Sequence, residues 1–124
     1  MIAIFDRNTD DNRLLVTKFL SVVLRHTNLC PDDRIELTRF GGVGERVWQL
    51  EANLDAGLTM TTSIAELAQI ASESGQSIDE LRCSSGNILL GLLDATFLFF
   101  QSVDKRIENK IASEFARVTP IADQ

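Results

Sequence analysis

The chain of 124 residues is predicted to be an all-α protein, a small bundle of four or five helices around a long C-terminal helix. Apolar residues recur at steps of three and four in several segments, which is the period of an amphipathic helix. Serine, threonine and aspartate stand before these segments as candidate N-caps. A run over residues 88–100, in which ten of thirteen residues are apolar, is expected to occupy the centre of the bundle.

Composition indicates one globular domain spanning residues 1–124. Apolar residues make up 44% of the chain and charged residues 24%, as in ordinary globular proteins. The 88–100 run is shorter than the roughly 20 apolar residues of a membrane span, so no membrane partner is expected. The first residues also lack the basic and apolar regions of a secretory signal. These features favour a cytoplasmic location.

Two cysteines, Cys30 and Cys83, lie far apart and form no C-x-x-C motif. We expect them to be reduced and buried, as is usual for thiols of a cytoplasmic protein. A redox pair or a single disulfide is the alternative.

The first predicted helix covers residues 11–28. Residues 9–11 offer an N-cap and an acidic first turn, which suits the positive end of the helix dipole. One face carries residues at steps of four, three and four: Leu15, Phe19, Val22 and His26. Pro31 ends the helix, because the residue before a proline is biased away from helical geometry.

Two segments near the N-terminus admit two interpretations. In a strand, Ile2 and Ile4 fall on one side and Ala3 and Phe5 on the other, and Ile35-Glu-Leu-Thr38 alternates in the same way. Residues 1–5 and 34–40 are therefore compatible with a short two-stranded ribbon. The sequence Pro31-Asp-Asp33 is equally typical of the start of a helical turn. A lone strand pair would need helices packed against it.

Two helices and a third segment, a turn or short helix, are predicted in the middle of the chain. The first covers residues 45–56, between a glycine-rich connection and Gly57 as its C-cap. The second and third each begin with a capping box, Ser63-Ile-Ala-Glu66 and Ser77-Ile-Asp-Glu80. They are expected to reach about residue 73 and residue 83.

The last predicted helix covers residues 88–118 and ends before Pro120. Whether residues 84–87 kink this helix or separate it from the preceding one is left open. Its apolar arc is broader than one neighbouring helix would cover, which suggests that part of it contacts another protein.

Acidic residues dominate the middle of the chain. The net charge is −6, and residues 51–101 hold seven acids and one base, Arg82. Residues 63–85 have partial helix-turn-helix spacing, with suitable residues at four positions, so a DNA-binding regulator is an alternative function: Ala71, Gly75, Ser77 and Leu81. The acidic charge would repel phosphate, however, and a nucleic-acid partner is not expected.

Motifs for catalysis, metal binding or nucleotide binding are not found. His26 is the only histidine, and phosphotransfer through it is a second alternative function, although it falls on the apolar stripe. Gly41, Gly42 and Gly44 precede a helix but lack the lysine and serine or threonine of a phosphate loop. The run starting at Asp6 departs from a calcium loop at its sixth and twelfth positions. We therefore predict no catalytic residue, no cofactor, no metal and no enzymatic activity.

By elimination, the sequence predicts a protein–protein interaction module: a small regulator, adaptor, inhibitor or chaperone-like protein. It is expected to form a homodimer through the C-terminal helix. The predicted interface residues are Leu93, Phe97 and Phe100.

Overall fold

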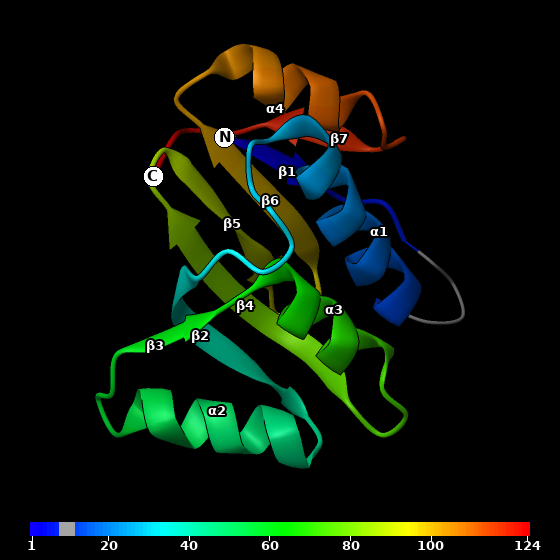
Figure 1. The fold of residues 1–124 in the computed structure, drawn as a ribbon. Helices are drawn as coiled ribbons and strands as arrows, with labels where there is room; N and C mark the ends of the chain where they lie inside the picture. Colours follow the sequence, from blue (N-terminus) through cyan, green and yellow to red (C-terminus); the bar gives the residue numbers. More distant parts are fainter. Residues whose placement is uncertain (8–11) are drawn as a thin grey trace.

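The computed structural model describes residues 1–7 and 12–124, and it has an α/β fold built around one seven-stranded antiparallel sheet (Figure 1). About 35% of the chain is helix and 33% is strand. The predicted all-α bundle is therefore wrong. The predicted N-cap at residues 9–11 lies outside the described residues.

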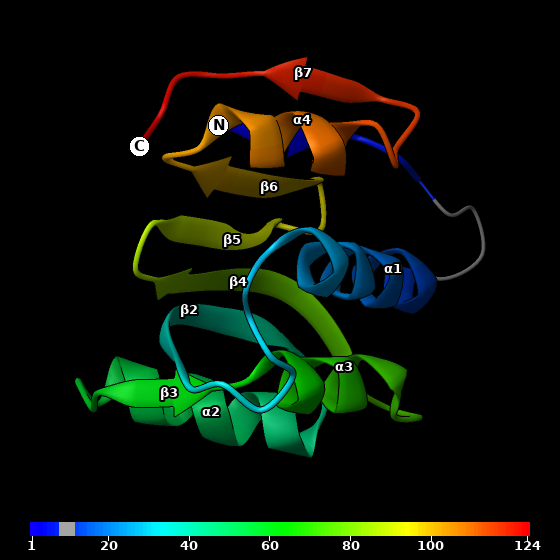
Figure 2. The same ribbon diagram turned by 45° about the horizontal axis from the view of Figure 1, so that its top comes forward.

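The elements follow one another as β1 (Ile2–Ile4), α1 (Asn12–His26), β2 (Ile35–Val43), α2 (Glu45–Asp55), β3 (Met60–Thr62), α3 (Ile64–Ser72), β4 (Ser77–Ser85), β5 (Ile88–Leu93), β6 (Phe97–Ser102), α4 (Lys105–Ala112) and β7 (Val118–Pro120). The strand order in the sheet is β3-β2-β4-β5-β6-β1-β7 (Figure 2). All neighbouring strands are antiparallel. The hairpins β4–β5 and β5–β6 form the middle of the sheet.

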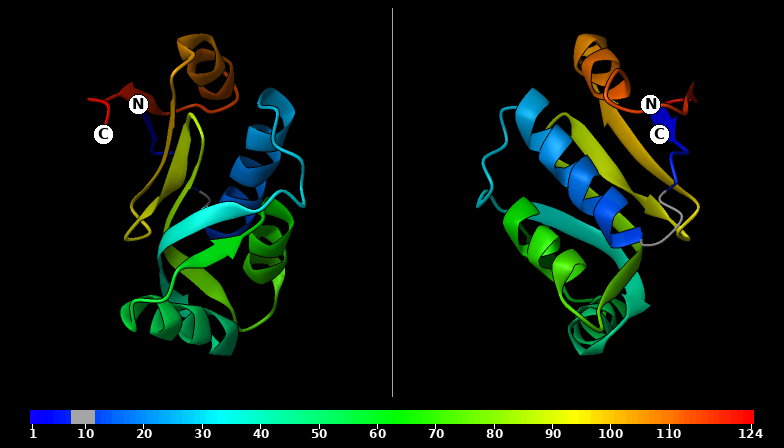
Figure 3. Two further views of the ribbon diagram at one scale, coloured as in Figure 1. Left: turned by 60° about the vertical axis from the view of Figure 1, so that its left-hand side comes forward. Right: turned by 90° about the vertical axis from the view of Figure 1, so that its right-hand side faces the viewer.

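Helices α1 and α3 lie side by side on one face of the sheet (Figure 3). Helix α4 packs against α1, β6 and β1, and α2 lies along β2 at the edge. Figure 3 shows no described helix over β4, β5 and β6 on the other side. We call that side the open face and the other the helix-covered face.

The core lies between the helices and the helix-covered face. Residues that are directly opposite each other on paired strands share a face, and two such rows are buried here. One row consists of Leu37, Cys83, Leu90, Phe100 and Ile2, and the next of Phe40, Leu81, Leu92, Leu98 and Ile4. Val16, Phe19 and Val23 of α1 and Leu67 and Ile70 of α3 close the core from above. Burial of each large side chain contributes roughly 1.5–3 kcal/mol.

Three predicted helices are confirmed with small shifts of their ends. They are α1, α2 and α3, and the hydroxyl oxygen of Ser63 accepts a hydrogen bond from the Glu66 amide at 3.1 Å, as its capping box predicts. The second capping box is wrong, because residues 77–85 form β4. The helix pair of the DNA-binding alternative is therefore not formed.

The predicted helix over residues 88–118 is wrong as well. This stretch forms β5, β6, α4 and β7. Its first two strands are joined by a tight turn at Asp94 and Ala95, whose φ angles are 46° and 54°, and the Thr96 amide donates to the Leu93 carbonyl oxygen at 2.7 Å. Residues 84 and 85 end β4, and Gly86 and Asn87 turn the chain into β5, so residues 84–87 neither kink a helix nor separate two helices.

The predicted N-terminal ribbon is half right. Residues 2–4 and 35–43 are strands, but they do not pair with each other. Strand β1 lies between β6 and β7, whereas β2 lies between β3 and β4. Within the described residues, none of the helices has the length and apolar composition needed to cross a bilayer.

Candidate functional site

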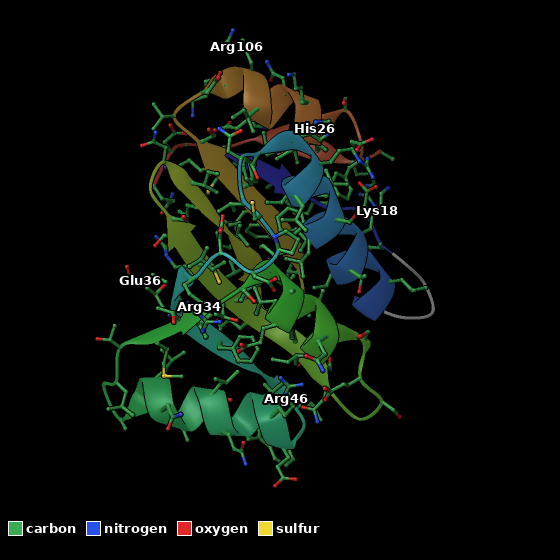
Figure 4. All side chains as sticks on the ribbon, in the orientation of Figure 1. Lys18, His26, Arg34, Glu36, Arg46 and Arg106 are labelled. Carbon is green, nitrogen blue, oxygen red and sulfur yellow. The ribbon has the colours of Figure 1, made fainter. Side chains whose placement is uncertain are left out.

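The open face is the surface on which partly exposed apolar and charged side chains meet. Residues one position along from the core rows point to this side, because strand side chains alternate. The side chains that the strands carry on it are Glu36, Arg39, Glu80, Arg82, Ser84, Leu89, Leu93, Phe97, Phe99 and Gln101. Figure 4 shows Glu36 on β2, at the margin of the sheet far from α1.

Leu93, Phe97 and Phe99 form the apolar part of the open face. Leu93 is 37% exposed, and Phe97 packs against Phe5 with ring centroids 5.2 Å apart. A pocket of about 240 Å³ lies beside them, lined by Met1, Arg82, Leu93, Phe97, Phe99, Ile121 and Gln124. This pocket has the size for one apolar side chain and has a guanidinium at its margin.

Gly91 allows Phe99 to lie flat on the sheet. A Cβ atom at Gly91 would come 2.5 Å from Cζ of Phe99 and 2.0 Å from the Leu81 carbonyl oxygen. Only a glycine leaves room for this aromatic ring, which is 7% exposed as a result. The open face is therefore smooth and apolar at its centre.

Charged side chains lie beside the apolar part of the open face, on β2 and β4, in two rows of opposite sign. Arg39 and Arg82 are directly opposite each other on β2 and β4. Two residues further along β4, the Glu80 carboxylate accepts from Arg39 at 3.4 Å. Glu51 of α2 lies close by. A Cβ atom at Gly41 would be 3.8 Å from Oε1 of Glu51 and 3.7 Å from Oε2 of Glu80.

Arg82 forms no side-chain hydrogen bond or ion pair with a described residue. Two like charges directly opposite each other on paired strands are unfavourable. Arg39 is compensated by Glu80, whereas Arg82 is not. An anionic group from outside the chain would stabilise it.

The structure separates the three predicted interface residues. Leu93 and Phe97 lie on the open face, at directly opposite positions of β5 and β6. Phe100 lies on the helix-covered face and is 0% exposed, so it belongs to the core. The expected placement of all three on one helix fails because β6 sends alternate residues to opposite faces. Glu80, Arg82 and Phe99 were not predicted as part of this surface.

His26 lies at the end of α1 and is half-buried, with Nε2 3.2 Å from a carboxylate oxygen of Glu114 (Figure 4). Arg25 pairs with the same carboxylate. The imidazole thus contributes to the contact between α1 and the segment after α4. This contact with Glu114 gives the phosphotransfer alternative no support.

Both cysteines are free thiols. Cys83 is buried in the core, and burial raises the pKa of its thiol to about 12, so it stays protonated and unreactive at neutral pH. Cys30 is exposed, which corrects the expectation of two buried thiols. In residues 1–7 and 12–124, no group of three or more histidine, cysteine or carboxylate side chains could hold a metal ion.

The glycine-rich segment before α2 has a structural role in the backbone. A Cβ at Gly42 would lie 2.0 Å from the Ser77 carbonyl oxygen, so this residue allows β2 to approach β4 closely. The first turn of α2 is occupied, since the Val47 amide donates to Oε1 of Gln76. A phosphate would have to displace this contact.

Glu108 is the buried charged residue of the described part of the chain, at 4% exposure. Its Oε2 accepts from the Ser102 amide and the Lys105 ammonium, both at 2.9 Å, and the Met1 ammonium lies 3.4 Å from Oε1. Burial alone raises the pKa of this carboxyl, but those three donors outweigh burial and hold the pKa below its usual range. Glu108 thus joins α4 to β6 and β1 as a structural carboxylate.

A wider crevice of about 540 Å³ lies at the end of the sheet, between α1, the β4–β5 turn and α4. Leu29, Ile88 and Ile107 are among its apolar lining residues. Asp104 also lines it but pairs with Arg106, whose hydrogen bond lowers the pKa of that carboxyl. The crevice therefore offers no free charge to a ligand.

Comparison with known proteins identifies no relative: no family model, no curated protein and no solved structure matches the chain.

Proposed function

We propose that this protein is a protein–protein interaction module and that a second copy of the same chain binds its open face. A regulatory or adaptor role follows from such an assembly. The observation that carries the proposal is the self-complementary character of the open face. Its basic row, acidic row and apolar centre lie side by side on four neighbouring strands, β2, β4, β5 and β6.

The distribution of charge supports a second copy as the partner. The whole chain has a net charge of −6, so two copies repel each other over most of their surfaces. The strand side chains of the open face carry two arginines and two glutamates, which sum to zero: Arg39, Arg82, Glu36 and Glu80. The strand side chains of this face therefore add no net repulsion between two copies.

The apolar centre supplies the attractive contact. Leu93 is exposed at the edge of the pocket, and the neighbouring Phe97 is partly exposed. Covering them with a second sheet removes apolar surface from water, at roughly 25 cal/mol per Å². Two sheets that pack face to face in this way are a common architecture.

A cytoplasmic location belongs to the same proposal. Cys30 and Cys83 are both free, and disulfides are rare in that compartment. The described residues offer no arrangement that supports a reaction, and we propose no enzymatic activity.

Sedimentation equilibrium over a wide range of protein concentration tests self-association. We expect a monomer–dimer equilibrium for the natural chain. Leu93→Lys should raise the dissociation constant at least tenfold, because it places a charge on the apolar centre, about 1.4 kcal/mol or more. Val103→Lys is the matched control, since Val103 is an even more exposed aliphatic residue, at 74%, between β6 and α4.

The control should leave the dissociation constant unchanged. A natural chain that stays monomeric at every concentration would contradict the proposal. So would equal weakening by both substitutions.

A further inference from the structure

The register of the sheet sets out two parallel rows on the open face. The basic row crosses β2, β4, β5 and β6 as Arg39, Arg82, Gly91 and Phe99, which are directly opposite one another. The acidic row lies two residues further along the same strands, as Gly41, Glu80, Leu93 and Phe97. Leu93 and Glu80 lie one residue beyond the pair Leu81–Leu92, so they are neighbours in this row.

We propose that two copies stack open face on open face about a two-fold axis that runs across the strands, between these two rows. This arrangement rests on the self-association proposed above. The axis exchanges the rows, so the basic row of each copy lies over the acidic row of the other. The paired strands then remain aligned, as in a sandwich of two sheets about 10 Å apart.

Each position along the rows then meets a suitable counterpart. Arg82 faces Glu80 of the partner copy, and this contact occurs twice because the axis is two-fold. Arg39 faces the end of the acidic row, where Glu51 of the partner copy lies close to Gly41. Positive charge therefore meets negative charge along β2 and β4.

The apolar positions match in size. Gly91 lies under Leu93 of the partner copy, and Phe99 lies under Phe97 of the partner copy. The Leu93 side chain of the partner copy thus meets a glycine, which has no side chain, and contacts the ring of Phe99 that lies against that glycine. The pocket of about 240 Å³ beside Phe99 receives the partner copy's leucine.

The arrangement explains why Arg82 has no counterion in its own chain. Its neighbour across the strands is another arginine, and Arg39 already takes Oε1 of Glu80. In the dimer, Glu80 of the partner copy supplies the missing carboxylate. Electrostatic complementarity of this kind fixes the register of an interface.

Glu36 is the other glutamate of the open face, and it discriminates between registers. It pairs with Ser84, two residues away from Arg82 on the side opposite to Glu80. The proposed axis carries Glu36 over the far end of the partner copy's β2, near Val43 and away from Arg82. A dimer in a different register would instead bring Glu36 to Arg82.

Charge reversal in pairs tests the arrangement. Arg82→Glu and Glu80→Arg are prepared separately and then mixed, with association measured by sedimentation. Each variant alone places two like-charged pairs in the interface, and we expect its dissociation constant to rise about a hundredfold. In the mixture, every arginine meets a glutamate, so a heterodimer should form with an affinity within about tenfold of the natural dimer.

Glu36→Arg mixed with Arg82→Glu is the matched control: its heterodimer keeps one of the two like-charged pairs, so it should bind about tenfold more weakly than the heterodimer of the Glu80–Arg82 mixture. Circular dichroism and thermal unfolding of each variant check that the substitutions leave the fold intact. If the natural chain dimerises but the Glu80–Arg82 mixture stays monomeric, the arrangement is wrong while self-association stands. Rescue by the Glu36 variant instead would also overturn it. A monomeric natural chain would overturn both.

Discussion

Replacing Phe100 by alanine is expected to lower the free energy of unfolding by about 3–5 kcal/mol. Phe100 is fully buried on the helix-covered face, in one row with Leu90 and Ile2. Truncation removes the buried ring and leaves a cavity that the surrounding strands and helices cannot close. Urea unfolding followed by circular dichroism measures the loss.

Leu93→Ala is the comparison for this prediction. Leu93 is on the open face of the neighbouring strand and is 37% exposed, so its truncation in dilute, monomeric protein should cost less than about 1 kcal/mol. A small cost for Phe100→Ala, or equal costs for the two substitutions, would show that β6 does not face the core as described.

Replacing Glu108 by glutamine is expected to cost about 2–3 kcal/mol at pH 7. The buried carboxylate accepts from the Ser102 amide and the Lys105 ammonium and lies near the Met1 ammonium. The amide keeps the shape but loses the charge that these donors stabilise. Urea unfolding at pH 7 measures the difference.

The pH dependence provides the sharper readout for Glu108. Its pKa is lower in the folded protein than in the unfolded chain, where a glutamate titrates near pH 4.3. The stabilisation is therefore fully present above about pH 4.3 and is lost as the pH falls through the folded pKa. The difference between the natural chain and Glu108→Gln should shrink in that acidic range.

Glu114→Gln is the control for the carboxylate prediction. Glu114 is 28% exposed and pairs with Arg25 and His26 at the surface, so its replacement should cost less than about 1 kcal/mol. A Glu108→Gln effect that stays constant down to pH 3 would contradict the assigned role of its charge.

The sequence predicts the first three helices well because their local signals agree. In α1, apolar residues at helical spacing meet the sheet, and Pro31 follows shortly after the helix ends. In α3, the Ser63 cap and the apolar positions Leu67 and Ile70 indicate the same element. Propensity, capping and periodicity are consistent there, which is when local reasoning succeeds.

The apolar run over residues 88–100 misleads because it lacks a clear period. In β5, buried leucines of the helix-covered face alternate with Leu89 and Leu93 of the open face, so apolar residues occupy both sides. The hairpin turn at Asp94 and Ala95 also contains no glycine, although both residues have positive φ. Neither the alternation nor the turn of a strand pair is visible in such a stretch.

The turn before β5 does carry a sequence signal for a hairpin. Gly86 and Asn87 join β4 to β5 as a two-residue loop, and a Gly-Asn pair between apolar segments is typical of a hairpin. The capping box Ser77-Ile-Asp-Glu80 favoured a helix at this place instead. In the structure, the Ser77 hydroxyl bonds to the Asp79 carboxylate within β4.

The candidate site was predictable only in part. Leu93 and Phe97 were selected because an apolar run this long implies a second contact, and both lie on the open face. The charged rows depend on strand register, which brings Arg39 next to Arg82 from 43 positions away in the chain. No local pattern contains that juxtaposition.

Solution NMR of leucine methyl groups with a soluble paramagnetic agent tests most directly that the open face is the contact surface. In dilute protein, we predict broadened signals for Leu93 and Leu14, and sharp signals for the buried Leu90 and Leu92. At high concentration, Leu93 should become protected while Leu14 on α1 stays broadened. Continued broadening of Leu93, or protection that arises on α1 instead, would contradict the account.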